Sequence, residues 1–306
     1  MNAMVSIMKR ELREYFTTPV AYVFIVIFLF LTGLFTFKAS GFFETGQADL
    51  RGFFNWHPWL YLFLIPAMAM RLWAEERKSG TIELLLTLPL TRMQAVLGKF
   101  LAAWLFTGLA LALTFPLWIT VNFLGRPDNG VIVSSYLGSW LMAGSFLAIG
   151  SCMSALTRNQ VIAFILTVVV CFLFVLSGFP LVLDAVSAWA PRVLVDGIAA
   201  LSFLTHFNSV ARGVIGLRDL LFFLSLAVFA LSFRLKSVPR QKGISIDFIG
   251  ASLAAIGIMG WKTAPIPAHW QDIALGWLLL CGCLSLGYVI AASVLKASGA
   301  EIYQPH

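Results

Sequence analysis

The sequence predicts an all-α integral membrane protein, and three observations support this fold class. Of the 306 residues, 60% are hydrophobic and only 11% are charged, and the mean hydropathy is +0.90. Soluble domains carry about a quarter charged residues, so this chain has too little polar surface for water. Its apolar runs reach the roughly 20 residues that a helix needs to cross a bilayer. Its basic residues gather in short clusters between those runs, as in membrane proteins generally.

The apolar runs predict a six-span helical bundle followed by an extra C-terminal hydrophobic hairpin. The six runs are 20–37, 56–73, 95–123, 136–156, 161–183 and 220–233. Two further stretches, 244–261 and 273–295, make up the hairpin. We therefore divide the chain into an interface helix (1–18), a six-span domain (19–240) and a C-terminal extension (241–306) with one or two further membrane helices.

Lysine and arginine counts predict the orientation of the spans. With the N-terminus in the cytoplasm, most of the basic residues fall on the cytoplasmic side of the bilayer. The opposite orientation would place them outside, against the positive-inside rule. Both termini are then cytoplasmic, with either six or eight spans.

The segment before Pro19 has the pattern of an amphipathic helix. Its apolar residues share one helical face, and its charged residues lie elsewhere on the helix. The charged positions of this predicted interface helix are Lys9, Arg10, Glu11 and Arg13. We expect the helix to lie in the inner membrane interface, either as a simple anchor or with a further role.

Segment 184–219 fits neither a span nor a short loop, because prolines and charged residues interrupt it. We expect short re-entrant helices that dip into the outer leaflet, with their ends buried by protein. In the fourth run, Gly144, Ala148 and Cys152 follow at four-residue spacing. Such a face of small residues permits close helix packing, either within the subunit or with a second copy.

The sequence carries no signature of catalysis or of its own energy source. It has no HExxH zinc motif and no P-loop, and its four histidines are scattered. Most acidic residues lie at the ends of the runs, with Asp247 the doubtful exception, so a carboxylate relay for ion coupling is missing. We expect no catalytic residue, no metal site and no bound cofactor in this chain. Nucleic-acid binding is also disfavoured, because no basic stripe with stacking aromatics is present.

The loop between the second and third runs has an unusual composition. Four charged residues, 75–78, are followed by the leucine-rich segment 82–88, which ends at Pro89. Thr91 and Gln94 then have the spacing of a capping box for the next helix. A leucine-rich helix in a charged loop requires a partner surface, which is either another protein or the bilayer itself.

This loop is also the most specific part of a family resemblance. The pattern E-x-R/K-x-G-T-[IL]-E-x-L-L after the second run, followed by P-[LV]-[ST]-R, resembles the permeases of type-2 ABC exporters. The residues that carry it in the loop are Glu75, Glu76, Lys78, Gly80, Thr81, Glu83, Leu84, Leu85, Leu88, Pro89, Leu90, Thr91 and Arg92. The N-terminal segment Lys9 to Leu12 and the outer stretch 203–216 fit the same family. The resemblance covers about residues 1–240 and is strongest to the gliding-motility-associated subgroup.

The resemblance implies a permease that works with a second permease, identical or paralogous, and with a dimer of ATP-binding subunits. ATP and Mg would bind those subunits, and the loop from Glu75 to Pro89 would act as the coupling helix. An accessory membrane or periplasmic subunit is a further possible partner. The second and fifth spans would line the route, so that Trp56, Trp59, Tyr61 and Phe63 flank it, or these aromatics form a belt at the outer interface.

Two readings of the function stay open at this point. The chain is either the permease of an ATP-driven exporter or a non-transporting membrane scaffold that uses the same loop to bind a partner. The sequence does not indicate the cargo, or whether the complex transports at all or performs mechanical work on an outer partner.

Overall fold

The computed structural model describes residues 3–44, 46, 48–81, 91–188, 191–213 and 216–236. Within these ranges every regular element is a helix, so the all-α fold class is confirmed there. The helices are α1 (Ala3–Thr17), α2 (Pro19–Leu34), the π-helix η1 (Phe35–Ala39), α3 (Arg51–Asn55), α4 (His57–Ala69), α5 (Arg71–Ser79), α7 (Arg92–Ala112), α8 (Phe115–Leu124), α9 (Asn129–Leu156), α10 (Gln160–Leu176), α11 (Pro180–Ser187), α12 (Arg192–Ala200), α13 (Phe203–Val210) and α14 (Leu217–Lys236). The predicted C-terminal hairpin lies outside the described residues.

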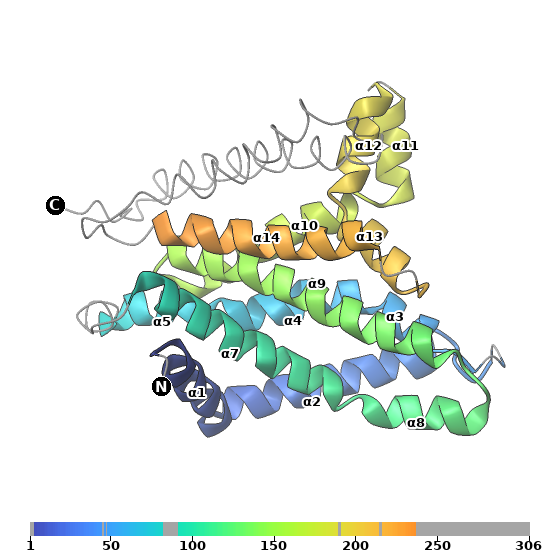
Figure 1. Cartoon of the computed structure of the whole chain (residues 1–306), viewed down its shortest axis with the longest axis horizontal. Helices are drawn as coiled ribbons and strands as arrows, with labels where there is room; N and C mark the ends of the chain where they lie inside the picture. Colours follow the sequence, from blue (N-terminus) through green and yellow to red (C-terminus); the bar gives the residue numbers. More distant parts are fainter. Residues whose placement is uncertain are drawn as a thin grey trace.

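Helix α9 is the centre of the bundle. In Figure 1 it runs between α7 and α14, and it also packs against α4 and α10. In its most apolar 18-residue stretch 72% of the residues are buried, against 28% for the stretch within α2 and η1. The small residues of α9 explain this central position, because they let several helices approach its backbone closely.

A reciprocal pair of tryptophans joins α9 to α7. Trp104 Nε1 donates to the Trp140 carbonyl oxygen at 2.9 Å, and Trp140 Nε1 donates to the Trp104 carbonyl oxygen at 3.1 Å. The two rings stack with their centroids 4.4 Å apart. A Cβ atom at Gly144 would lie 2.8 Å from Trp104 Nε1, so glycine is needed there. Gly144 therefore serves packing within the subunit, one of the two roles expected for this face of small residues.

In the part of the chain that the structure describes, three helices are long and apolar enough to cross a membrane, namely 19–39, 93–124 and 129–156. Helices α10 and α11 form a fourth candidate, although they are bent by 70° where they meet. The predicted second run is divided at Met70 into α4 and α5, and the predicted sixth run contains only a short apolar stretch, 219–228, within α14. By length and composition the described residues thus contain three or four spans, and the six-span count stays a prediction.

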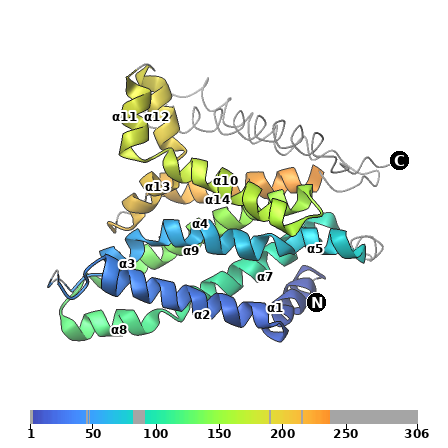
Figure 2. The same ribbon diagram turned by 180° about the vertical axis from the view of Figure 1, so that it is seen from behind.

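Helix α1 ends just before Pro19, as the sequence indicates, but its apolar face contacts protein. Ile7 is buried, and Tyr15 stacks on Phe106 of α7 with centroids 5.1 Å apart. Figure 2 shows α1 lying across the end of the bundle, near α5 and the beginning of α7. Burial raises the pKa of the Tyr15 hydroxyl well above its ordinary value. Helix α1 is thus more than a simple membrane anchor, because it also packs on the helical bundle.

The predicted re-entrant region forms the short helices α11, α12 and α13. Helices α11 and α12 stand side by side and project away from the long helices (Figure 1). Helix α13 packs on α9 and α14, where His206 is buried and stacks on Phe222. His206 Nδ1 lies 2.6 Å from Asp219 Oδ1, and Nε2 lies 2.9 Å from the Ala200 carbonyl oxygen. Both ring nitrogens thus face acceptors. Through these two contacts, His206 of α13 links the beginning of α14 to the end of α12.

Candidate functional site

Three helices from distant parts of the sequence meet at one buried lysine. Lys99 Nζ of α7 lies 2.8 Å from Glu11 Oε2 of α1 and 2.7 Å from Glu76 Oε1 of α5. Arg10 Nη2 completes the group at 2.9 Å from Glu11 Oε1. We call Arg10, Glu11, Glu76 and Lys99 the Lys99 cluster.

The Lys99 cluster is largely removed from solvent. The exposed fraction of the side chain is 5% for Lys99, 9% for Glu11 and 18% for Glu76. The Lys99 ammonium also lies 5.5 Å from the centre of the Trp73 ring, a cation–π distance. Buried charges are tolerated only when they are paired, so each member depends on the others. The cluster therefore specifies how α1, α5 and α7 sit relative to one another.

A glycine next to Lys99 allows α1 to approach α7. A Cβ atom at Gly98 would lie 2.9 Å from Ile7 Cγ2 and 3.2 Å from the Met4 carbonyl oxygen, closer than side chains normally pack. Glu11 lies one helical turn after Ile7, so this close contact carries its carboxylate to Lys99.

Helix α5 ends with a set of local hydrogen bonds. Gly80 adopts φ 74°, the left-handed conformation that closes many helices and that glycine adopts without strain. Ser79 Oγ donates to the Glu75 carbonyl oxygen at 2.9 Å and lies 2.9 Å from Thr81 Oγ1. These bonds define where α5 stops.

Arg71 and Glu75 form an exposed ion pair on the same helix. Arg71 Nε lies 2.8 Å from Glu75 Oε2 and Nη2 lies 3.1 Å from Oε1. The hydrogen bonds from Arg71 lower the pKa of the Glu75 carboxyl group below its ordinary value. The stabilisation from this pair is thus present above the ordinary pKa and is lost as the pH falls through the lowered one. Because both side chains are exposed, the contribution is small.

The structure places the predicted coupling residues in two groups. The first group lies at the end of α5 and just after it, and it consists of Glu75, Glu76, Lys78, Gly80 and Thr81. Of these residues, Glu76 belongs to the Lys99 cluster. The other predicted positions, Glu83, Leu84, Leu85, Leu88 and Pro89, lie outside the described residues. The capping box after them is confirmed, because Gln94 N donates to Thr91 Oγ1 at 3.3 Å and Thr91 N donates to Gln94 Oε1 at 3.0 Å.

The predicted interface-helix residues also divide into two groups. Glu11 is buried and Arg10 contacts it, whereas Lys9 and Arg13 are exposed. Lys99 is the functional candidate that sequence reasoning missed. Its signal was a lysine near the beginning of the long apolar run 95–123, where a charge is expensive unless it has a partner.

The four predicted pathway aromatics differ in their exposure in this structure. Tyr61 is buried and its hydroxyl lies 2.8 Å from Ser139 Oγ of α9. Trp56 Nε1 donates to Ser40 Oγ at 3.0 Å. Trp59 is partly buried against the core, and Phe63 is 57% exposed. Their role in lining a route therefore stays a prediction.

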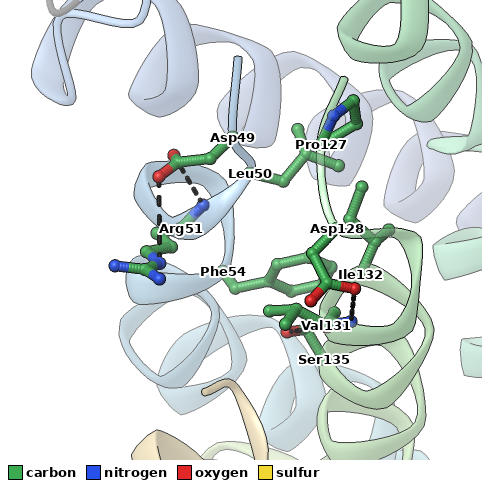
Figure 3. A pocket seen from close by; sticks show the side chains of 9 residues that line it. All are labelled: Asp49, Leu50, Arg51, Phe54, Pro127, Asp128, Val131, Ile132 and Ser135. Atoms are coloured by element: carbon green, nitrogen blue, oxygen red, sulfur yellow. Dashed lines mark hydrogen bonds and ion pairs between the residues drawn. The ribbon is translucent and has the colours of Figure 1, made fainter. Parts of the chain in front are cut away.

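A shallow pocket of about 100 Å³ lies at the other end of α9 from the Lys99 cluster (Figure 3). Its lining residues are Asp49, Leu50, Arg51, Phe54, Pro127, Asp128, Val131, Ile132 and Ser135. Both carboxylates already have local partners, because Asp49 accepts from the Arg51 backbone and Asp128 caps α9. Within the described ranges, no group of three histidine, cysteine or acidic side chains is placed to hold a metal ion.

Comparison with known proteins identifies the family of the chain. Residues 5–290 match the family described as ABC-2 family transporter proteins. This chain belongs to that family. The match extends past residue 240, where the resemblance read from the motifs ended, and so includes most of the C-terminal extension.

Two curated relatives are similar in sequence to part of this ABC-2 family chain. The chain is 34% identical over 117 residues to the probable multidrug ABC transporter permease YbhS of Escherichia coli strain K12, and equally to YbhS of Escherichia coli O157:H7. The matched stretch is 38% of this chain but only 30% of each relative. Permeases of the ABC-2 family normally work with an ATP-binding subunit.

Proposed function

We propose that this chain is the permease subunit of an ATP-driven exporter and that it is coupled to a separate ATP-binding subunit through the loop between α5 and α7. The observation that carries the proposal is the Lys99 cluster. It joins the helix that enters this loop, the helix that leaves it and the N-terminal helix by buried ion pairs. A movement of the loop is therefore transmitted to α1, α5 and α7 together.

The remaining features of the proposal follow the family pattern. Six spans cross a bacterial inner membrane with both termini in the cytoplasm, and residues 241–306 add one or two membrane helices. Two permease copies, or this chain and a paralogue, assemble with two ATP-binding subunits that hold ATP and Mg. Within the family, the loop motif supports a likeness to the gliding-motility-associated permeases.

Closure of the ATP-binding subunits would move the loop between α5 and α7. Because α1, α5 and α7 are held together at the Lys99 cluster, this movement would rock them as one body. Rigid-body rocking of this kind is a standard way to expose a route alternately to the two sides of a membrane. The YbhS proteins are named as probable multidrug permeases, which makes apolar organic compounds the first cargo to test.

The test begins with purification of the tagged chain in mild detergent and identification of its partners by mass spectrometry. A P-loop ATPase is expected to co-purify, and its ATP hydrolysis should rise when the permease is present. Glu83→Ala and Leu85→Ala should abolish this stimulation without loss of membrane insertion. A chain that purifies without any nucleotide-binding partner, even after cross-linking, would favour the scaffold function instead.

A further inference from the structure

The junction between α4 and α5 contains a hydroxyl group from a distant helix. In a continuous helix the Ala74 N–H would donate to the Met70 carbonyl oxygen. Here the Ala74 N–H donates to Ser154 Oγ of α9 at 3.0 Å, and Ser154 Oγ donates to the Met70 carbonyl oxygen at 2.8 Å. The Trp73 N–H also donates to Ser154 Oγ, at 3.2 Å. Ser154 therefore stands inside the backbone ladder, which is a recognised cause of a break in a helix.

All hydrogen-bonding capacity of the Ser154 hydroxyl is used at this junction. A serine hydroxyl offers one donor and two acceptor lone pairs, which matches the one carbonyl and the two amides that it contacts. The residue is fully buried, so water cannot replace it there without rearrangement. The side chain thus completes the backbone hydrogen bonds at the point where the two helices separate.

Helix α9 also touches the junction one turn earlier. A Cβ atom at Gly150 would lie 2.4 Å from Ala69 Cβ, so only glycine permits this approach. Gly150 and Ser154 lie four residues apart and therefore on the same face of α9. The backbone of α9 is in this way brought close enough for a short serine side chain to reach into the ladder.

Helix α5 is consequently held at both of its ends by different helices. At its beginning, Ser154 of α9 holds the junction with α4. Toward its end, Glu76 is paired with Lys99 of α7. The segment that follows α5 is the loop assigned above to the ATP-binding subunit, so the direction of α5 determines where that loop is presented.

We propose that Ser154 is a positioning residue, which sets the direction of α5 and thereby the coupling between the ATP-binding subunit and the membrane-spanning helices. This inference rests on the proposed function. It adds a residue of the central helix, distant from the loop in sequence, to the machinery of coupling. Removal of the hydroxyl would let the Ala74 N–H donate directly to the Met70 carbonyl oxygen, as in a continuous helix, and this would change the direction of α5 relative to α4.

The experiment compares Ser154→Ala with Ser151→Ala. Ser151 lies on the same helix and is equally buried, but among the described residues its hydroxyl bonds within α9 itself, to the Ala148 carbonyl oxygen. The two variants lose the same atom, and only the first alters the junction. If Ser154→Ala does not insert stably, Ser154→Gly, which also lacks the hydroxyl and adds no thiol for the spin label, takes its place.

Two quantities are measured for each variant. The first is the distance between spin labels at exposed positions 63 and 78, one on α4 and one on α5, in the permease without its partner and with its four native cysteines replaced. The second is ATPase stimulation and export by the assembled complex. Ser154→Ala should shift the distance and reduce export per ATP several-fold while the ATP-binding subunit still co-purifies. Ser151→Ala should leave both quantities unchanged.

The outcomes separate this inference from the function on which it rests. An unshifted distance in Ser154→Ala overturns the positioning role, whatever the complex does. A shifted distance with unchanged export per ATP overturns the link between α5 and coupling. If the wild-type permease stimulates no ATPase, the proposed function fails and the coupling role of Ser154 fails with it. The distance measurement would then show separately whether Ser154 directs α5.

Discussion

Lys99 is the residue that links α1, α5 and α7 through buried ion pairs. It pairs with one carboxylate oxygen on each of two helices and lies over an aromatic ring, while almost none of its surface meets solvent. A buried ion pair adds little net stability compared with apolar packing, but the loss of one partner is costly. The cluster is therefore better understood as a device that selects one arrangement of the helices than as a source of stability.

Replacement of Lys99 tests this account at the level of a single residue. Lys99→Ala leaves Glu11 and Glu76 buried without their shared counter-charge, and this should lower the free energy of unfolding by about 3–5 kcal/mol. Lys78→Ala, at an exposed position of α5, should have almost no effect. Denaturant-induced unfolding in detergent measures both variants.

The triple variant Lys99→Met, Glu11→Gln and Glu76→Gln completes the test of the cluster. It removes all the charges that meet at Lys99, so a large part of the lost stability should return. If the triple variant were as unstable as Lys99→Ala, the packing of the lysine side chain rather than its charge would be responsible. ATPase stimulation, measured alongside, should fall in Lys99→Ala because the three helices would no longer move together.

At the scale of the elements, the position of α1 depends on Gly98 of α7, the helix on which α1 packs. The apolar face of α1 was expected to meet the membrane interface, yet Ile7, Tyr15 and Phe16 pack on α7. An amphipathic pattern shows only that one face avoids water. Whether lipid or protein covers that face depends on the neighbouring surface, and Gly98 makes the surface of α7 suitable.

Substitution of Gly98 should therefore loosen α1. In Gly98→Ala the new methyl group meets Ile7 and the Met4 carbonyl oxygen, so α1 must shift outward. We expect faster proteolysis within α1 and a lower thermal midpoint. The matched control is Gly33→Ala in α2, where nothing lies within 4 Å of the new Cβ atom. Because alanine favours a helix over glycine by about 1 kcal/mol, the control should be neutral or stabilising. Equal behaviour of the two variants would contradict a close contact at Gly98.

At the scale of the whole molecule, the described helices are organised around α9, a largely buried helix rich in serine and glycine, and the more apolar α2 and α10 lie at the periphery. Large apolar side chains of α2 and α10, among them Phe30 and Val161, are exposed in this structure, while α9 holds serines and glycines inside. This is the arrangement expected in lipid, where burial of apolar groups gives no gain and small residues drive helix packing.

The orientation of the bundle can be measured directly. With a cytoplasmic N-terminus, Lys78→Cys should be protected in intact cells from a thiol reagent that does not cross the inner membrane. Phe43→Cys, in the loop between η1 and α3 and 67% exposed, should react. Both variants are made in a chain whose native cysteines have been replaced. The reverse labelling pattern would invert the topology, and the loop between α5 and α7 would then be unable to meet a cytoplasmic ATPase.

The sequence by itself determined the helical membrane class, the approximate place of most helices, the end of α1 at Pro19 and the capping box at Thr91. These features depend on local causes, namely the length of an apolar run, the fixed φ of proline and hydrogen bonds within one turn. It also singled out Glu76 and Glu11, from a motif and an amphipathic pattern, without indicating that they meet.

Only the tertiary structure decided which distant groups come together. Glu11 and Lys99 are 88 residues apart, and Met70 and Ser154 are 84 residues apart. No local pattern encodes such contacts, because each depends on how closely two helix backbones approach and on which rotation brings their side chains face to face. For the same reason the second run appeared continuous in the sequence. The hydroxyl that interrupts it belongs to another helix.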